Sequence, residues 1–225
     1  MRGSITAETI KQIRKNKVAL FGLFLVCLLV FVGVFAPWVA PYDPYDADLD
    51  ISLHPPSMQH WLGTDEEGRD VLSRIIYGAR ISLKVGIIAS SISLIIGAIL
   101  GLIAGFFRGW VETIIMRFTD VMFGFPALLF MIGITAAVPR PSIEVAMLAI
   151  GLVSWPGMAR IMRAQVLTIA EQEYVTAARS LGYSTPRIIL RHVVPNSLAP
   201  VIVAFTMSIA GAVMAEASLS FIGLG

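Results

Sequence analysis

The feature that most constrains this chain is a series of long stretches without Asp, Glu, Lys or Arg. Five such runs occupy residues 18–39, 85–107, 121–138, 145–159 and 193–215. A bilayer core about 30 Å thick is crossed by roughly 20 apolar residues in a helix. Backbone groups in lipid must bond within their own segment, and these runs do not alternate as barrel strands do. We therefore predict an all-α, polytopic integral membrane protein with five transmembrane helices.

Composition agrees with a chain whose solvent is mostly lipid. Of the 225 residues, 56% are hydrophobic and only 14% are charged, whereas soluble domains carry about 25% charged residues. This composition excludes a disordered chain, a coiled coil and a disulfide-stapled secreted domain. A formal net charge of +2 argues against a nucleic-acid partner. The first run is too long for a signal peptide and lacks a small-residue cleavage pattern, so we expect it to be retained.

The basic residues predict the orientation. Most of the 17 Lys and Arg residues lie in the tail 1–17 and in the segments 108–120 and 160–192. Because cytoplasmic loops are enriched in Lys and Arg, the N-terminus is predicted to be cytoplasmic. The expected organisation is a cytoplasmic tail 1–17, a first transmembrane helix 18–40, an acidic extracytoplasmic loop 41–80, and a core 81–225 with a cytoplasmic loop 160–196. Residues 68–84 are predicted to form a helix that leads from the extracytoplasmic loop into the second span.

The sequence pattern of the cytoplasmic loop predicts two short helices joined by a tight turn. No residue interrupts a helix over 162–181, and Gly182 is a good left-handed stop. Residues 184–186 then resemble a helix cap followed by proline in the first turn, and a helix over 187–192 would end before Pro195.

The resulting compact knob has a possible contact surface. Ala177 and Ala178 form a patch of small residues, with Leu181 one turn further, which lets another protein's backbone approach closely. A solvated connector that serves only membrane topology is an equally good interpretation at this point.

Other residues suggest helix packing and give no sign of a metal or nucleotide site. Gly97, Gly101 and Gly105 recur every four residues, which predicts a groove for close helix packing, either static or sliding. The three histidines are scattered over loops on both sides of the membrane, so we predict no metal site. No GxxxxGK[ST] phosphate loop is present, so ATP-driven action would require a partner.

An acidic cluster in the outer loop has two interpretations. Asp65, Arg69 and Asp70 could form a docking surface for an extracytoplasmic binding protein. They could also close a folded turn through Asp–Arg pairs over a helix start, and the two roles can hold together.

Several motifs resemble a known family. The segment EYVTAARSLG at 173–182, with Pro195 beyond it, resembles the EAA loop of ATP-binding-cassette (ABC) importer permeases. Three further segments resemble motifs of the C-type permease subunits of dipeptide, oligopeptide or nickel importers. They are APYDP at 40–44, HWLGTDEEGRDVLSR at 60–74 and EASLSFIGLG at 216–225. The resemblance implies that the loop is a coupling helix, whose contact positions here are Glu173, Tyr174, Ala177, Ala178, Leu181, Gly182 and Pro195. Thr176 stands where the general pattern has a glutamate, and we carry that role to Glu173.

The resemblance also implies the partners. It implies a multi-pass inner-membrane subunit of a type I ABC importer for dipeptides or oligopeptides, working with a second, B-type permease, two cytoplasmic ATPases and an extracytoplasmic binding protein. ATP and Mg²⁺ would be bound by the ATPases, so this chain is expected to hold no cofactor and to catalyse no reaction. Members of the family usually continue past the last motif to a sixth span, whereas the given sequence stops at Gly225, so we expect either a fragment or a shortened form.

Three other functions compete with this interpretation. A secondary transporter driven by an ion gradient would need ionisable residues at the bilayer midplane and internal repeats, and a membrane enzyme would need a set of catalytic groups. A non-transporting assembly partner is the third.

Overall fold

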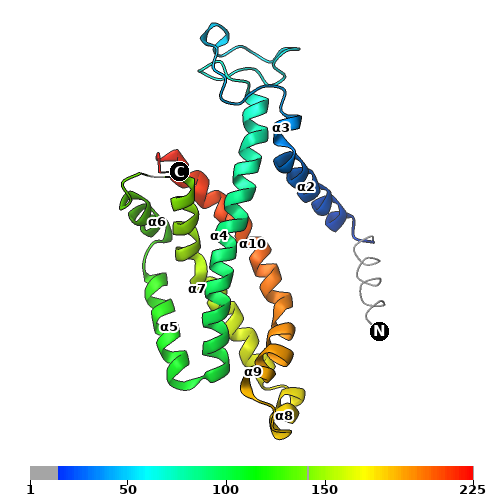
Figure 1. Ribbon diagram of the computed structural model, residues 1–225, viewed down its shortest axis with the longest axis vertical. Helices are drawn as coiled ribbons and strands as arrows, with labels where there is room; N and C mark the ends of the chain where they lie inside the picture. Colours follow the sequence, from blue (N-terminus) through cyan, green and yellow to red (C-terminus); the bar gives the residue numbers. More distant parts are fainter. Residues whose placement is uncertain (1–14, 141, 225) are drawn as a thin grey trace. The chain divides into compact units, whose positions relative to one another are not determined.

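The computed structural model describes residues 15–140 and 142–224, and its regular elements over these ranges are helices, as predicted (Figure 1). They are α2 (Lys17–Val34), α3 (Ala36–Val39), η1 (Leu49–Ile51), α4 (Val71–Phe107), α5 (Gly109–Gly124), α6 (Ala127–Ala136), α7 (Ile143–Ala170), α8 (Glu173–Ser180), α9 (Thr185–Ile188), the π-helical turn η2 (Ile189–Val193) and α10 (Val194–Phe221). Most of the predicted tail 1–17, and Gly225, lie outside the described residues.

The number of candidate spans agrees with the predicted all-α membrane fold. Four helical segments are long and apolar enough to cross a bilayer: Lys17–Val34, Val71–Phe107, Ile143–Ala170 and Thr185–Phe221. The pair α5 and α6 provides a fifth if the two are counted together. The chain divides into two compact units, Met1–Leu83 and Lys84–Gly225, and each is described by itself.

In the first unit, polar caps start the helices. The Asn16 side chain accepts hydrogen bonds from the backbone N–H groups of Val18 and Ala19, which caps α2. The helix α4 begins at Val71, slightly later than predicted. Its 37 residues correspond to about 55 Å, which exceeds the bilayer core, so part of α4 extends beyond the lipid.

The third predicted span differs from a straight helix. Residues 109–124 are already helical, although 108–120 was expected to be an inner connection, and α5 and α6 meet at an angle of 85°. Phe125 is extended at the break (φ −94°, ψ 136°) because the residue before a proline avoids the helical region, and Pro126 has no N–H to continue the ladder. The predicted run 121–138 is therefore a sharply bent pair.

In the second unit, α7 is the central helix. It holds the longest series of buried residues, and it packs against α10, α6 and α5 (Figure 1). It ends at Ala170, so the continuous helix predicted over 162–181 is wrong. Gln172 adopts an extended conformation (φ −68°, ψ 146°), and the chain turns before α8 begins at Glu173.

Candidate functional site

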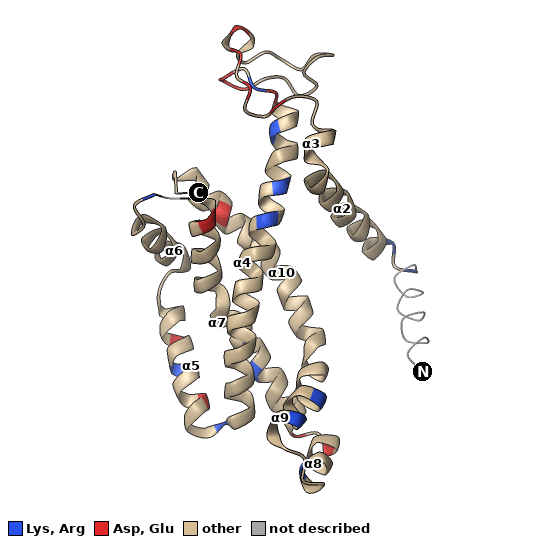
Figure 2. Ribbon diagram, viewed as in Figure 1, with Lys and Arg blue, Asp and Glu red and all other residues tan. Residues whose placement is uncertain are grey.

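The coupling knob, which we define as residues 171–195 and name for the role that the resemblance implies, connects α7 to α10. It contains α8, α9 and η2, which Figure 1 shows grouped at one end of α7 and α10. Figure 2 shows that this end carries both basic and acidic residues, whereas α10 is largely free of charge.

Buried apolar side chains hold the knob to the helices. Val175 and Ala178 of α8, with Ile188 and Val193, belong to one buried cluster. The same cluster contains residues of α7 and α10, namely Met158, Met162, Val166, Ile169 and Val201. This continuous packing explains the turn after Ala170: bending the chain back buries the apolar side of α8 against the end of α7. The knob is thereby fixed to both helices by close-packed contacts.

Gly182 ends α8 as predicted. Its φ of +75° lies in the left-handed region that favours glycine. The N–H of Gly182 donates to the carbonyl of Arg179 (2.9 Å), and the N–H of Tyr183 donates to that of Ala178 (3.1 Å). These two bonds form a Schellman motif, which satisfies carbonyls left free at the helix end. The expected left-handed stop is confirmed.

The second half of the knob departs from the expectation. The predicted short helix does not end before Pro195, because α9 runs through η2 into α10. The N–H of Val194 reaches back five residues to the carbonyl of Ile189, and the Asn196 side chain donates to the carbonyl of His192 at 2.6 Å. Pro195 lies in the first turn of α10, where a missing N–H is tolerated.

The outward side of the knob carries apolar residues among polar ones. Glu173, Tyr174 and Ala177 are exposed, and Leu181 is 74% exposed. Ala178 is only 4% exposed and points into the buried cluster. The expected patch of two alanines on the surface is therefore wrong: Ala177 alone is available to a partner, and Ala178 contributes packing.

Ionic and aromatic contacts tie the knob to neighbouring helices. Arg108, at the turn between α4 and α5, donates to the Glu171 carboxylate at 2.9 Å. The Arg179 guanidinium lies 5.5 Å from the ring centre of Phe106 on α4, and within the knob the Arg187 guanidinium lies 4.3 Å from the ring centre of Tyr183. The knob thus contacts the end of α4 as well as α7 and α10.

In the first unit, Asp65 organises the outer loop. Its carboxylate accepts hydrogen bonds from the backbone N–H groups of Glu67 and Arg69 and from the Arg69 side chain, each at 2.9 Å, and it pairs with Arg74. Burial raises the pKa of Asp65, but the hydrogen bonds from Arg69, Glu67 and Arg74 outweigh it and lower that pKa to about 2.

Asp70 caps the start of α4. Its carboxylate accepts from the N–H and the hydroxyl of Ser73, both at 2.8 Å, and lies 3.0 Å from Nδ1 of His60. The residue is 3% exposed. Although burial raises the pKa of Asp70, the bonds from Ser73 and His60 hold it below its ordinary value. Asp65, Arg69 and Asp70 are therefore occupied by internal contacts, and the buried Asp70 is not available as a docking group.

The glycine series on α4 lies against α7. Gly97, Gly101 and Gly105 are all buried. A Cβ atom added at Gly97 would lie 2.7 Å from the carbonyl oxygen of Trp155. One added at Gly105 would lie 2.9 Å from that of Arg163. The backbones of α4 and α7 approach too closely for any side chain here.

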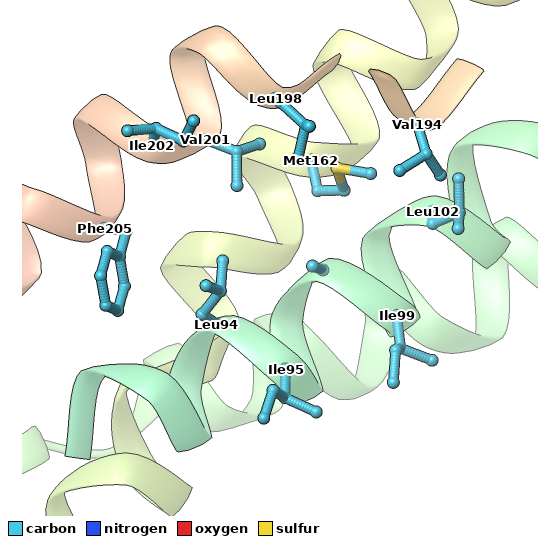
Figure 3. Close-up of a pocket in the computed structure, with 11 residues that line it drawn as sticks. Leu94, Ile95, Ile99, Leu102, Met162, Val194, Leu198, Val201, Ile202 and Phe205 are labelled. Carbon is cyan, nitrogen blue, oxygen red and sulfur yellow. The ribbon is translucent and has the colours of Figure 1, made fainter. Parts of the chain in front are cut away.

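An apolar groove of about 360 Å³ lies between α4, α7 and α10 (Figure 3). Its lining includes Leu94 and Ile99 of α4, Met162 of α7, and Leu198 and Phe205 of α10. A charged or polar ligand would lose its hydration here without compensation, so this groove suits only apolar chains or side chains.

Sequence reasoning missed the ion pairs between α5 and α7. Arg160 pairs with Asp120 at 2.7 Å, and the Nε atom of Arg163 donates to Glu112 at 2.7 Å. The spacing of these charges could have indicated the pairs. Glu112 and Asp120 lie two turns apart on α5, and Arg160 and Arg163 lie one turn apart on α7.

Comparison with protein families gives two matches. Residues 97–225 match the family described as "Binding-protein-dependent transport system inner membrane component". Residues 4–56 match the "N-terminal TM domain of oligopeptide transport permease C".

Individual relatives align over nearly the whole chain. A dipeptide transport system permease, DppC of Bacillus subtilis (strain 168), is 41% identical over 222 residues, covering 99% of this chain and 69% of that protein. A di/tripeptide permease, DppC of Pseudomonas aeruginosa (strain UCBPP-PA14), is 45% identical, covering 93% and 71%. A glutathione permease, GsiD of Escherichia coli O6:K15:H31, is 40% identical, covering 96% and 71%.

A solved structure described as "Crystal structure of an amino acid ABC transporter with histidines" shares the fold. It aligns with a TM-score of 0.50 at 21% identity and covers 68% of this chain and 77% of that chain. Permeases of binding-protein-dependent ABC systems work with an ATPase, a binding protein and a partner permease, and are not themselves catalytic. The family matches, the relatives and the fold therefore show that this multi-pass inner-membrane chain belongs to the OppC/DppC-type permeases of peptide ABC importers.

Proposed function

We propose that the chain imports dipeptides or oligopeptides as one half of a permease, and that the coupling knob is its contact with a cytoplasmic ATPase. The relatives are described as permeases for dipeptides, di/tripeptides and glutathione, and this supports the peptide cargo. The observation that carries the coupling role is the exposed face of Tyr174, Ala177 and Leu181, on a knob whose opposite face is packed into the core. Exposed apolar side chains grouped in this way are typical of a protein interface.

The geometry suits a lever. Because Val175, Ala178, Ile188 and Val193 pack continuously with α7 and α10, a displacement of the knob would move these helices with it. Closure of two ATPase subunits around ATP and Mg²⁺ would supply that displacement, and a second, B-type permease would complete the pathway. Shifting the pathway from 1:99 to 99:1 between two states requires about 5.5 kcal/mol of differential binding. Nucleotide binding by the ATPases has to provide this through the knob.

The outer loop is the proposed contact for the binding protein. Since Asp65 and Asp70 are used internally, we place the contact on the exposed apolar side chains of the same loop, Leu53, Met58 and Trp61. The internal network around Asp65 would hold this surface in one conformation.

Co-purification tests the coupling role. The chain would be tagged, expressed with its candidate partners and solubilised gently, and the amount of ATPase recovered would be measured. Leu181→Glu and Tyr174→Ala should each reduce recovery strongly, because they remove apolar contact without altering the buried cluster. Leu49→Glu is the matched control, since Leu49 is also 74% exposed but lies in the outer loop.

Transport tests the cargo. Proteoliposomes holding the whole complex should take up a labelled tripeptide when the binding protein and ATP are present. Equal ATPase recovery with Leu181→Glu and Leu49→Glu would contradict the coupling site, and uptake of nickel in place of peptide would contradict the cargo.

A further inference from the structure

A polar hollow lies beside the helix α5, in a part of the chain otherwise suited to lipid. Its volume is about 310 Å³, and its lining consists of Glu112, Thr113, Met116, Arg117 and Asp120 of α5, with Arg163 of α7. Figure 2 shows both acidic and basic segments along α5. Ionisable residues within a candidate span are costly and usually functional, so this hollow requires an explanation.

Two ion pairs occupy the carboxylates of the hollow. Glu112 accepts from both the Nε and an Nη atom of Arg163, and the side chains are only about 20% and 34% exposed. Asp120 accepts from Arg160 at 2.7 Å, and that guanidinium also lies 4.1 Å from the ring centre of Phe123. Both acidic groups of the hollow are therefore neutralised by arginines of α7.

Arg117 differs from Arg160 and Arg163 in its ionic contacts. Over residues 15–140 and 142–224, no carboxylate oxygen lies within 4.0 Å of its side-chain nitrogens, whereas Arg160 and Arg163 each have one. The apolar residues Ile114 and Phe118 of α5 do not line the hollow and are exposed. When Arg160 is counted with its partner Asp120, the cluster has two carboxylates and three guanidinium groups, and Arg117 supplies its one excess positive charge.

The chemistry of an unpaired guanidinium points to a carboxylate. Arginine binds carboxylates in a planar, two-pronged geometry, and the bond strengthens where water is scarce. Every unmodified peptide ends in a carboxylate, whatever its side chains. The apolar groove between α4, α7 and α10 offers no polar partner for such a group.

We propose that Arg117 binds the C-terminal carboxylate of the peptide cargo as it passes through the permease. This inference rests on the proposed import of peptides. It explains how one site can accept peptides of varied sequence, because the recognised group is common to all of them. It also assigns Glu112 and Asp120 the role of positioning groups that keep Arg160 and Arg163 from competing for the cargo.

Transport by the reconstituted complex gives the first test. Arg117→Gln should lower uptake of free trialanine by about tenfold or more, as expected for loss of a hydrogen-bonded charge. Arg117→Lys should retain part of the uptake, and Ile114→Ala, which does not line the hollow, should match the unmodified chain. The Arg117→Gln complex should still contain its partner permease. Loss of that partner would overturn the proposal, since it would show that Arg117 pairs with the neighbouring subunit.

Thiol labelling separates binding from a structural role. In a Cys27→Ser background, Thr113→Cys places a thiol in the hollow and Ile114→Cys places one outside it. In the complex held with ATP and vanadate, free trialanine should slow labelling at position 113 but not at 114, and its C-terminal amide should have no effect. Equal protection by acid and amide, or none by the acid, would overturn the proposal. If the unmodified complex imports peptide while Arg117→Gln matches it, only this inference fails; if no peptide is imported at all, the proposed function fails with it.

Discussion

Replacing Gly97 by alanine tests whether the backbones of α4 and α7 are in the close contact described above. The added Cβ would lie 2.7 Å from the carbonyl oxygen of Trp155, 2.9 Å from the amide nitrogen of Ala159 and 2.6 Å from the Cβ of Met158. Ordinary contacts of a Cβ begin near 3.4 Å. Two of the three atoms belong to the backbone, so no side-chain rotation relieves the overlap. The two helices would have to separate by roughly 0.7 Å at this crossing.

The expected magnitude follows from two opposing terms. Overpacking of this kind costs about 1–3 kcal/mol, and separation also weakens dispersion contacts along the crossing. Alanine favours a helix over glycine by about 1 kcal/mol. We expect Gly97→Ala to lower the free energy of unfolding by about 1 kcal/mol overall. The matched control is Gly157→Ala on α7, where no atom lies within 4 Å of the added Cβ, and this change should stabilise by about 0.5–1 kcal/mol.

The assay is reversible unfolding in mixed micelles, with the denaturing detergent SDS as titrant and far-ultraviolet circular dichroism as signal. The two variants should differ by about 2 kcal/mol, with Gly97→Ala the less stable. Equal stability, or a more stable Gly97→Ala, would refute the close approach of α4 to α7.

Three further outcomes are expected. Gly182→Ala should cost about 1 kcal/mol, because an alanine at φ +75° is strained although space is open, and hydrogen exchange at the end of α8 should show the fraying. Asp70→Ala should cost about 0.5–2 kcal/mol through loss of the α4 cap, seen as faster exchange of the Ser73 amide, whereas Asp70→Asn should retain most of the protection. Since the folded-state pKa of Asp65 is lowered from 3.8 to about 2, its contribution to loop stability should be complete above pH 4 and lost as the pH falls toward 2. A carbon-13 titration of the Asp65 carboxyl with a midpoint near its ordinary value would contradict the network described for the loop.

Sequence periodicity and charge predicted the helical membrane fold because lipid permits few alternatives. In a bilayer, an uncharged apolar run of about 20 residues can satisfy its backbone hydrogen bonds almost only as a helix. The position of Gly182 was likewise readable, since a glycine after a helical run and before a cap is a local signal. The EAA-type motif and the outer-loop motif pointed to the family, and the relatives confirmed it.

Local signals failed where contacts distant in sequence decided the conformation. No glycine or proline marks the end of α7 at Ala170; the chain turns there because bending buries Val175 and Ala178. The same packing buries Ala178, which was predicted to lie on the surface. At Pro195 the local rule predicted a helix end, yet a π-helical turn carries the chain into α10.

The sequence by itself determined that this chain crosses a membrane as helices, which residues begin and end several of them, and which family it belongs to. These properties depend on neighbours along the chain and on the polarity of the solvent. Only the tertiary structure decided that Ala178 is buried, that the glycines of α4 meet the backbone of α7, and that Arg117 lacks a carboxylate partner among the described residues. Those properties depend on which side chains meet across helices, and a pairing between residues some 40 to 60 positions apart leaves no periodic trace in the sequence.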